Sequence, residues 1–140
     1  MPTPRLFTLE EAERTLPLVR RIVEDLVSVY PLWRAGVARY EALGLDATPQ
    51  SGESGEMIAV RSDVAALAER IDGYLRELES IGCEFKGFEA GLVDFRSLRE
   101  DRPIFLCWRL GEARITHWHE LDGGFAGRQP VDDAVLSEIP

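Results

Sequence analysis

The sequence is poor in the side chains that most often cross-link a fold or carry out catalysis. Only two of its 140 residues are histidine and only two are cysteine, Cys83 and Cys107, which form no Cys-x-x-Cys motif. We interpret both cysteines as small buried apolar residues in a reducing compartment. The chain also has no Gly-x-Ser-x-Gly, His-Glu-x-x-His or Gly-Lys-Ser/Thr motif, which excludes the common forms of serine hydrolase, zinc protease and phosphate loop.

Positive charge and long apolar runs are missing too. The formal net charge is −9, whereas nucleic acids and anionic membranes attract basic surfaces. No apolar run approaches the ~20 residues of a membrane-spanning helix, and the N-terminal stretch turns acidic where a signal peptide would be apolar. We therefore expect a cytoplasmic protein that binds neither nucleic acid nor membrane. Residues 1–140 have the length of a single domain with a sizeable core.

Apolar residues spaced alternately by three and four predict two long helices, over residues 7–44 and 57–82. Thr8 is the expected N-cap of the first helix, and Glu11 completes a capping box with it. Gly82 is the expected stop of the second helix. The loop between them, residues 45–56, is rich in Gly and Ser, so the helices should form an antiparallel, coiled-coil-like hairpin.

The first helix is more apolar than a contact with one other helix requires. A second apolar stripe runs beside the first and consists of Leu18, Ile22, Val29 and Leu32. Because a surface helix usually has one stripe, we predict a homodimer through this helix, with the sheet of the same chain as the alternative cover. Pro17 and Pro31 each remove one backbone hydrogen bond, and the pattern continues in register through both, which predicts kinks rather than breaks.

The pattern changes after Gly82 to the two-residue period of β-strands, over residues 83–130, and residues 131–140 have the character of a tail. The expected fold class is α+β, with the helical hairpin packed on a small C-terminal antiparallel sheet of three or four strands. The expected elements are a strand at 91–95, a charged connector at 96–102, and a hairpin of strands 103–110 and 113–121.

A two-residue Gly111-Glu112 turn would fix the register of that hairpin. It would pair Leu106 with His117 and Ile104 with His119, so both histidines should lie on the apolar face that packs on the helices. Cys107 would then lie on the opposite face, which argues against a Cys–His dyad.

Both histidines of the chain lie in the stretch Thr-His-Trp-His-Glu. His117 and His119 share one face of a strand, about 7 Å apart at the backbone, which suits two ligands of one divalent metal such as zinc. Third-ligand candidates are Asp94, Glu89 and Asp122. The alternative is that the histidines are hydrogen-bonded core or pocket residues.

Asp94 is flanked by Val93 and Phe95, which predicts a buried carboxylate that needs a partner. The candidate partners are Arg96, Arg109 and His119. The resulting pair is either a structural ion pair or a tuned acid–base pair.

The glycine-rich loop over residues 122–128 has two interpretations. Its backbone amides, with Arg128, have the composition of an anion-binding loop. Alternatively, Phe125 is an apolar anchor that closes the core, and the glycines permit a tight path.

Four stretches together resemble the bacterial domain-of-unknown-function 2203 family. They are FTLEEAERTLPLV, GLVDF, CWRLGE and WHELDGGFAGRQP, and the likeness covers nearly the whole chain. The resemblance implies a compact bacterial protein and carries over no catalytic or ligand residue. In that family the Trp-His-Glu triplet is typical, whereas the position of His117 varies. This directs attention to a polar cluster of Asp94, Arg109, His119 and Glu120.

Two functions remain open from the sequence, and it does not decide whether the protein is an enzyme. The first is a non-enzymatic interaction or oligomerisation module built on the helical hairpin. The second is a metal- or small-molecule-binding domain with its site between hairpin and sheet, around His117, His119 and nearby carboxylates. The first has the clean apolar repeats and the missing catalytic motifs in its favour.

Overall fold

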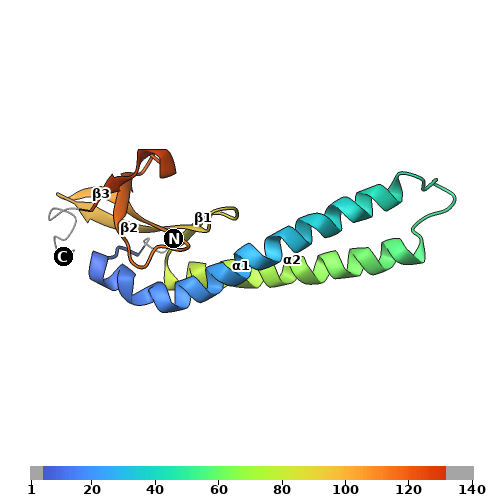
Figure 1. Cartoon of the computed structure of the whole chain (residues 1–140), viewed down its shortest axis with the longest axis horizontal. Helices are drawn as coiled ribbons and strands as arrows, with labels where there is room; N and C mark the ends of the chain where they lie inside the picture. The colour runs from blue at the N-terminus through green and yellow to red at the C-terminus, as the bar shows by residue number, and fades with distance from the viewer. Residues whose placement is uncertain (1–4, 132–140) are drawn as a thin grey trace.

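Two long helices form an antiparallel hairpin in the computed structural model, which describes residues 5–131 (Figure 1). Helix α1 spans Leu9–Gly44 and helix α2 spans Gly55–Ile81. The capping box at the start of α1 is confirmed, because the Thr8 hydroxyl accepts from the Glu11 amide (3.0 Å) and the Glu11 carboxylate accepts from the Thr8 amide (2.9 Å). Gly82 ends α2 with a φ of 106°, as predicted.

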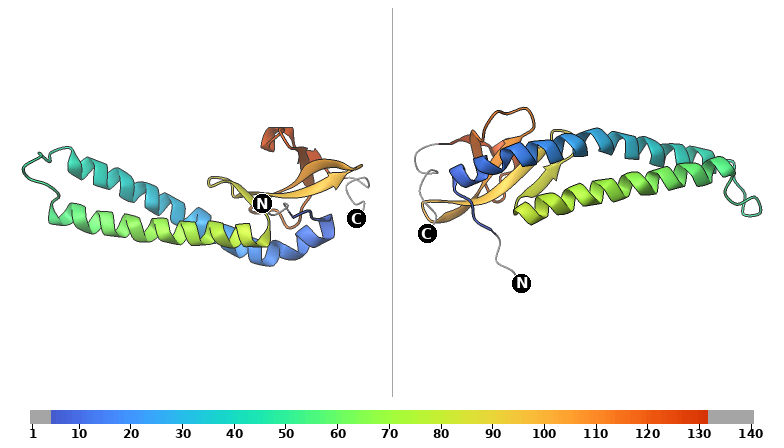
Figure 2. Two further views of the ribbon diagram at one scale, coloured as in Figure 1. Left: turned by 180° about the vertical axis from the view of Figure 1, so that it is seen from behind. Right: turned by 90° about the horizontal axis from the view of Figure 1, so that it is seen from below.

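Helix α1 continues through both of its prolines. The hairpin extends well beyond the sheet in every view, so its distal half is a pair of helices without a third layer (Figure 2). The second apolar stripe of α1 is partly buried and partly exposed. Ile22 and Val29 are buried within the chain, whereas Leu18 and Leu32 are 52% and 57% exposed. Ile22 and Val29 belong to the core that the helices and the sheet of this chain share, so the chain itself covers part of the stripe.

Removing the cap at the start of α1 should have a measurable cost. Thr8→Ala deletes the oxygen that accepts from the Glu11 amide, so we expect the free energy of unfolding to fall by about 1 kcal/mol. Thr8→Ser keeps that oxygen and should stay within a few tenths of wild type. Urea unfolding followed by circular dichroism would measure both, and equal losses in the two variants would contradict a role for the cap.

Five antiparallel strands follow the hairpin, in the order β1-β2-β3-β4-β5. They are β1 (Glu84–Gly87), β2 (Leu92–Arg99), β3 (Arg102–Arg109), β4 (His117–Glu120) and β5 (Gln129–Pro130), with one 3-10 turn, η1 (Phe125–Gly127), before β5. The predicted α+β class and the hairpin packed on a small antiparallel sheet are confirmed, although the sheet has more strands than predicted. Of the predicted tail, residues 131–140, only Val131 lies within the described residues.

The predicted connector at residues 96–102 is wrong. Strand β2 runs on to Arg99, and a two-residue turn at Glu100 and Asp101 leads into β3. Both turn residues have positive φ, 52° and 63°, as the tight turns that suit the twist of a β-hairpin require. The extension of β2 through residues 96–99 is stabilised at Ser97, which is buried and whose hydroxyl donates to the Phe7 carbonyl (2.6 Å).

The predicted register between β3 and β4 is also wrong, by one residue. Leu106 pairs with Trp118 and Phe105 pairs with His119. The connection is a loop over residues 110–116. A tight turn closes at its start, where the Glu112 amide donates to the Arg109 carbonyl (3.0 Å), and contacts with α1 then hold the chain in a loop before β4 begins. Arg20 donates to the Glu112 and Ala113 carbonyls (3.4 and 3.3 Å), and the Glu13 carboxylate accepts from the Ile115 amide (3.2 Å).

This shift exchanges the two faces of β4, because side chains alternate along a strand. Trp118 joins the core between sheet and helices, with Val93, Phe95, Ile104, Leu106 and Trp108. The histidines lie on the other face of the sheet, turned away from the helices. The prediction that they face the helices is therefore wrong, and so is the prediction that Cys107 lies on the opposite face from them.

Candidate functional site

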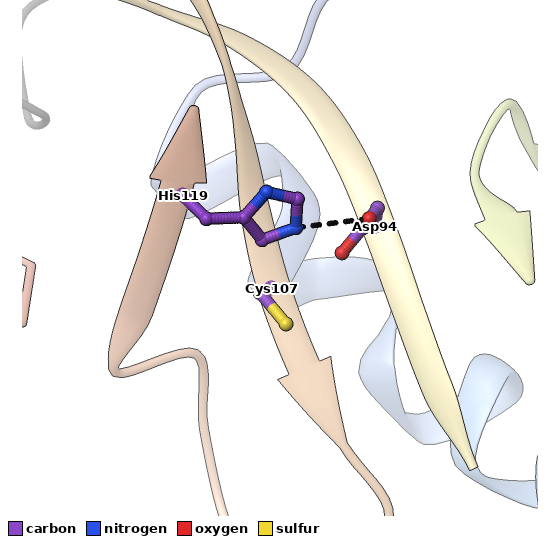
Figure 3. A group of neighbouring side chains, drawn as sticks. All are labelled: Asp94, Cys107 and His119. Atoms are coloured by element: carbon purple, nitrogen blue, oxygen red, sulfur yellow. Dashed lines mark hydrogen bonds and ion pairs between the residues drawn. The ribbon is translucent and has the colours of Figure 1, made fainter. Parts of the chain in front are cut away.

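Three buried side chains of different chemistry meet on the outer face of the sheet, from three adjacent strands (Figure 3). Asp94 lies on β2, Cys107 is paired with it on β3, and His119 lies on β4. Nε2 of His119 is 3.0 Å from Oδ2 of Asp94. Donor atoms of the three residues all lie within 4.8 Å of one another. We call this group the Asp94–Cys107–His119 cluster.

A hydrogen bond from Nδ1 of His119 holds the imidazole ring so that Nε2 points into the cluster. Nδ1 is 2.6 Å from the carbonyl oxygen of Glu120, and because a carbonyl only accepts, Nδ1 carries a proton and donates it. Metal-binding histidines commonly hold their ring in this way, with the distal nitrogen bonded to a carbonyl or carboxylate. Nε2 is therefore the nitrogen that faces Asp94 and Cys107. Its 3.0 Å contact with Asp94 requires a proton between the two atoms, which a bound metal would replace.

Burial raises the pKa of two side chains of the cluster, Asp94 and Cys107. Asp94, Cys107 and His119 are 4%, 1% and 2% exposed. Burial raises the pKa of the Asp94 carboxyl, against the opposing effect of His119. Burial, with the adjacent Asp94 carboxylate, raises the pKa of the Cys107 thiol to about 12. A thiol that stays protonated near neutral pH is a weak nucleophile, so the arrangement does not favour cysteine catalysis.

The cluster forms part of the wall of a cavity of about 300 Å³. Its other walls come from strands β2 and β3, from the loop after β4 and from the start of η1, and comprise Leu92, Phe105, Leu121, Gly124 and Phe125. Lys86 of β1, the one lysine in the sequence, also lines it. This cavity opens on the sheet face that the helices do not cover, whereas the sequence predicted a site between hairpin and sheet.

The structure brings Asp94 and His119 together, one of the pairings expected from the sequence. His117 lies on the same face, but its Nδ1 is 2.8 Å from the Thr116 hydroxyl and it lies outside the cluster. Glu120 supplies its carbonyl to His119, while its side chain pairs with Arg102 (2.8 Å).

Arg109 and Arg128 lie beside Phe125 of η1 and not in the Asp94–Cys107–His119 cluster. The Arg109 guanidinium lies over the Phe125 ring, 5.9 Å from its centroid. Arg128 donates to the Glu112 carboxylate (2.8 Å) and to the Cys107 carbonyl (3.2 Å). Its charge is therefore paired with Glu112, and an anion site at Arg128 stays a prediction. Phe125 is 44% exposed on the cavity side, so the expectation that it closes the core is wrong.

Sequence reasoning missed two residues of the site, Cys107 and Lys86. Cys107 could have been found from Trp118, the largest apolar side chain of β4, because the face that Trp118 takes decides which residues share a face with Cys107. Placing Trp118 in the core turns both histidines to the outer face, where Cys107 lies beside Asp94 on the neighbouring strand. Nothing in the spacing of Lys86 distinguished it from other charged residues.

The fold and the buried side chains define an α+β protein whose small antiparallel sheet carries a His–Asp–Cys cluster on the face away from a helical hairpin. Residues 5–131 match the family described as uncharacterized conserved protein (DUF2203), and the chain belongs to that family. The resemblance found in its motifs is thereby confirmed. No curated protein and no solved structure matches the chain. Between residues 5 and 131, neither helix combines the length and apolar character needed to cross a membrane.

Proposed function

We propose that this protein binds a divalent transition metal, such as zinc, through Asp94, Cys107 and His119. One observation carries the proposal: a thiol, an imidazole and a carboxylate, the three ligand types of zinc, converge from three strands within 4.8 Å. Tetrahedral zinc with bonds of about 2.0–2.3 Å separates its ligand atoms by roughly 3.3–3.8 Å. The cluster needs only small side-chain adjustments to reach that spacing.

The remaining coordination position would face the cavity. Three protein ligands with one open position are typical of zinc sites that bind water or a substrate, whereas structural sites use four protein ligands. The metal would also resolve the burial of the cluster, because coordination stabilises the thiolate of Cys107 and the carboxylate of Asp94. A purely structural His119–Asp94 pair is the competing explanation, and it predicts no metal affinity.

Cobalt titration of untagged, metal-free protein tests the proposal. Cobalt(II) bound to Cys107 should produce a thiolate-to-metal charge-transfer band and the visible bands of a tetrahedral site. Cys107→Ser should abolish the charge-transfer band. Cys83→Ser is the matched control, because Cys83 is also buried and free but lies after α2, with its sulfur 3.5 Å from the Leu78 carbonyl. No spectral change with wild type, or a band that persists in Cys107→Ser, would contradict the proposal.

A second candidate function is self-association through the distal hairpin. A groove of about 470 Å³ lies between α1 and α2, lined by Leu32, Gly36, Val64 and Leu67 among others. Leu32 is more than half exposed at this groove. The exposed Leu32 belongs to the second stripe of α1, from which the sequence predicted a homodimer through that helix.

Charges beside the groove favour a second copy of this chain as the occupant. Asp63 and Arg70 lie seven residues apart on α2, and both line the groove. The arrangement proposed here is centred on α2 rather than on α1 as the sequence predicted, with Leu32 of α1 beside it in the same groove. If two copies pack α2 against α2 antiparallel around Ala66 and Leu67, Asp63 of each copy lies opposite the partner's Arg70. A two-fold interface is self-complementary in this way.

Charge exchange tests this arrangement by sedimentation equilibrium. Wild type should be a dimer, and Arg70→Asp should weaken dimerisation by at least about tenfold, because it places two like-charge pairs in the interface. The double variant Asp63→Arg/Arg70→Asp restores opposite charges and should recover the wild-type association. A monomeric wild type, or no recovery in the double variant, would contradict the proposal.

A further inference from the structure

The cavity beside the cluster combines apolar walls with one flexible cation. Leu92, Leu121 and the rings of Phe105 and Phe125 provide apolar surface. The volume of about 300 Å³ lies at the lower end of small-molecule sites. A ligand that fills it is therefore small and has an apolar part that can contact the two phenyl rings.

The charge around Phe105 favours a ligand with a negative group. The Lys86 ammonium and the Arg96 guanidinium each lie 5.1 Å from the centroid of the Phe105 ring. Both pair with the same carboxylate, Glu84, each at 3.0 Å. Asp94 also lines the cavity, and in the proposed metal site its carboxylate and the Cys107 thiolate are balanced by the divalent ion. Two cations against the Glu84 carboxylate then leave a local positive excess in a chain whose net charge is −9. Lys86 is 42% exposed at its side chain and lines the cavity, so it can turn toward a ligand.

The chemistry of the walls distinguishes between anions. A phosphate group is usually held by several donors, such as arginine forks or a run of backbone amides. Here Arg128 is engaged by Glu112 (2.8 Å), and Lys86 is the cation that lines the cavity. One ammonium with two phenyl walls suits a carboxylate on an aromatic or other apolar body.

We propose that the cavity binds a small organic carboxylate, with its oxygens at the open metal position beside His119, its charge balanced by Lys86 and its apolar body against Phe125. The proposal rests on the metal site proposed above. It assigns to Lys86 a role in ligand binding and none in metal binding, and this division makes the two proposals separable.

Calorimetric titration of zinc-loaded protein with benzoate, and with benzyl alcohol as the uncharged probe of the same shape, tests the proposal. Benzoate should bind at least tenfold more tightly than benzyl alcohol. Lys86→Met should weaken benzoate binding by about three- to fivefold, with zinc affinity unchanged, and Lys86→Arg should retain most of it. Arg14→Met, which removes an exposed cation on α1 paired with Glu10, is the control and should bind benzoate as wild type does.

The outcomes separate the two proposals. Zinc binding together with Lys86-dependent benzoate binding supports both. Zinc binding with no benzoate binding, with equal affinity in Lys86→Met, or with equal affinity for benzyl alcohol overturns the carboxylate inference and leaves the metal site standing. A wild type that binds no zinc overturns the metal site and the carboxylate inference with it.

Discussion

Replacing His119 by alanine should lower the zinc affinity of the protein by more than about a hundredfold, whereas His117→Ala should leave it nearly unchanged. Loss of a residue that only supports a metal ligand typically costs about 10–100-fold, so loss of a ligand should cost more. His119 points Nε2 at Asp94 from within the cluster, whereas His117 contacts Thr116 outside it. Competition against a chromophoric zinc chelator would measure both affinities.

The two histidine variants form a matched pair, since they lie two residues apart on one strand face. Circular dichroism must first show that His119→Ala folds, because the variant leaves Asp94 buried without its partner. Cys107→Ser removes a different ligand while keeping the His119–Asp94 contact, and it should show a comparable loss of affinity. Wild-type affinity in both folded variants, or a loss confined to His117→Ala, would contradict the proposed ligand set.

Phe95→Ala should lower the free energy of unfolding by about 3–5 kcal/mol. Phe95 is fully buried between the sheet and the helices. Its ring meets the edge of Phe7 at a centroid distance of 5.1 Å and an angle of 81°. The variant would leave a cavity and also loosen the N-terminal segment, which is bonded to β2 through the Phe7 amide and the Arg96 carbonyl (2.8 Å).

Phe125→Ala is the control for this prediction, because it removes the same side chain from a position that is 44% exposed. Its cost should stay below about 1 kcal/mol. Urea unfolding at equilibrium, followed by circular dichroism, would compare the two variants. If they lose similar stability, the core does not lie where the Phe7–Phe95 contact places it.

The helical half of the fold could be predicted because its signals are local. The capping box at Thr8 and Glu11, the three-and-four spacing and the stop at Gly82 each depend on residues within a few positions of one another. These signals are also redundant, so the prolines within α1 did not obscure them.

The sheet register could not be predicted in the same way, because contacts far along the chain set it. Glu13 and Arg20 of α1 form hydrogen bonds with the loop after β3. No local sequence pattern predicts these bonds, because the partners lie far apart in the chain. Gly111-Glu112 looked like a complete turn, and the resulting error of one residue moved every side chain of β4 to the wrong face.

The error in register affected the prediction of some residues of the candidate site and not of others. Asp94 was expected to be buried and paired, and His119 was among its expected partners, because a carboxylate between Val93 and Phe95 needs a partner wherever the sheet places it. Cys107 could not be predicted as part of the site, because the wrong register placed it on the face opposite the histidines. Lys86 depends on the position of β1, whose contact with the cavity appears only in three dimensions.

A crystal structure of untagged protein incubated with zinc, with anomalous data collected on both sides of the zinc edge, tests the central claim most directly. The account predicts one strong anomalous peak on the outer face of the sheet, about 2.0–2.3 Å from a thiolate, an imidazole nitrogen and a carboxylate oxygen, supplied by Cys107, His119 and Asp94. A fully ordered cluster with no peak, or zinc bound only elsewhere on the molecule, would contradict it.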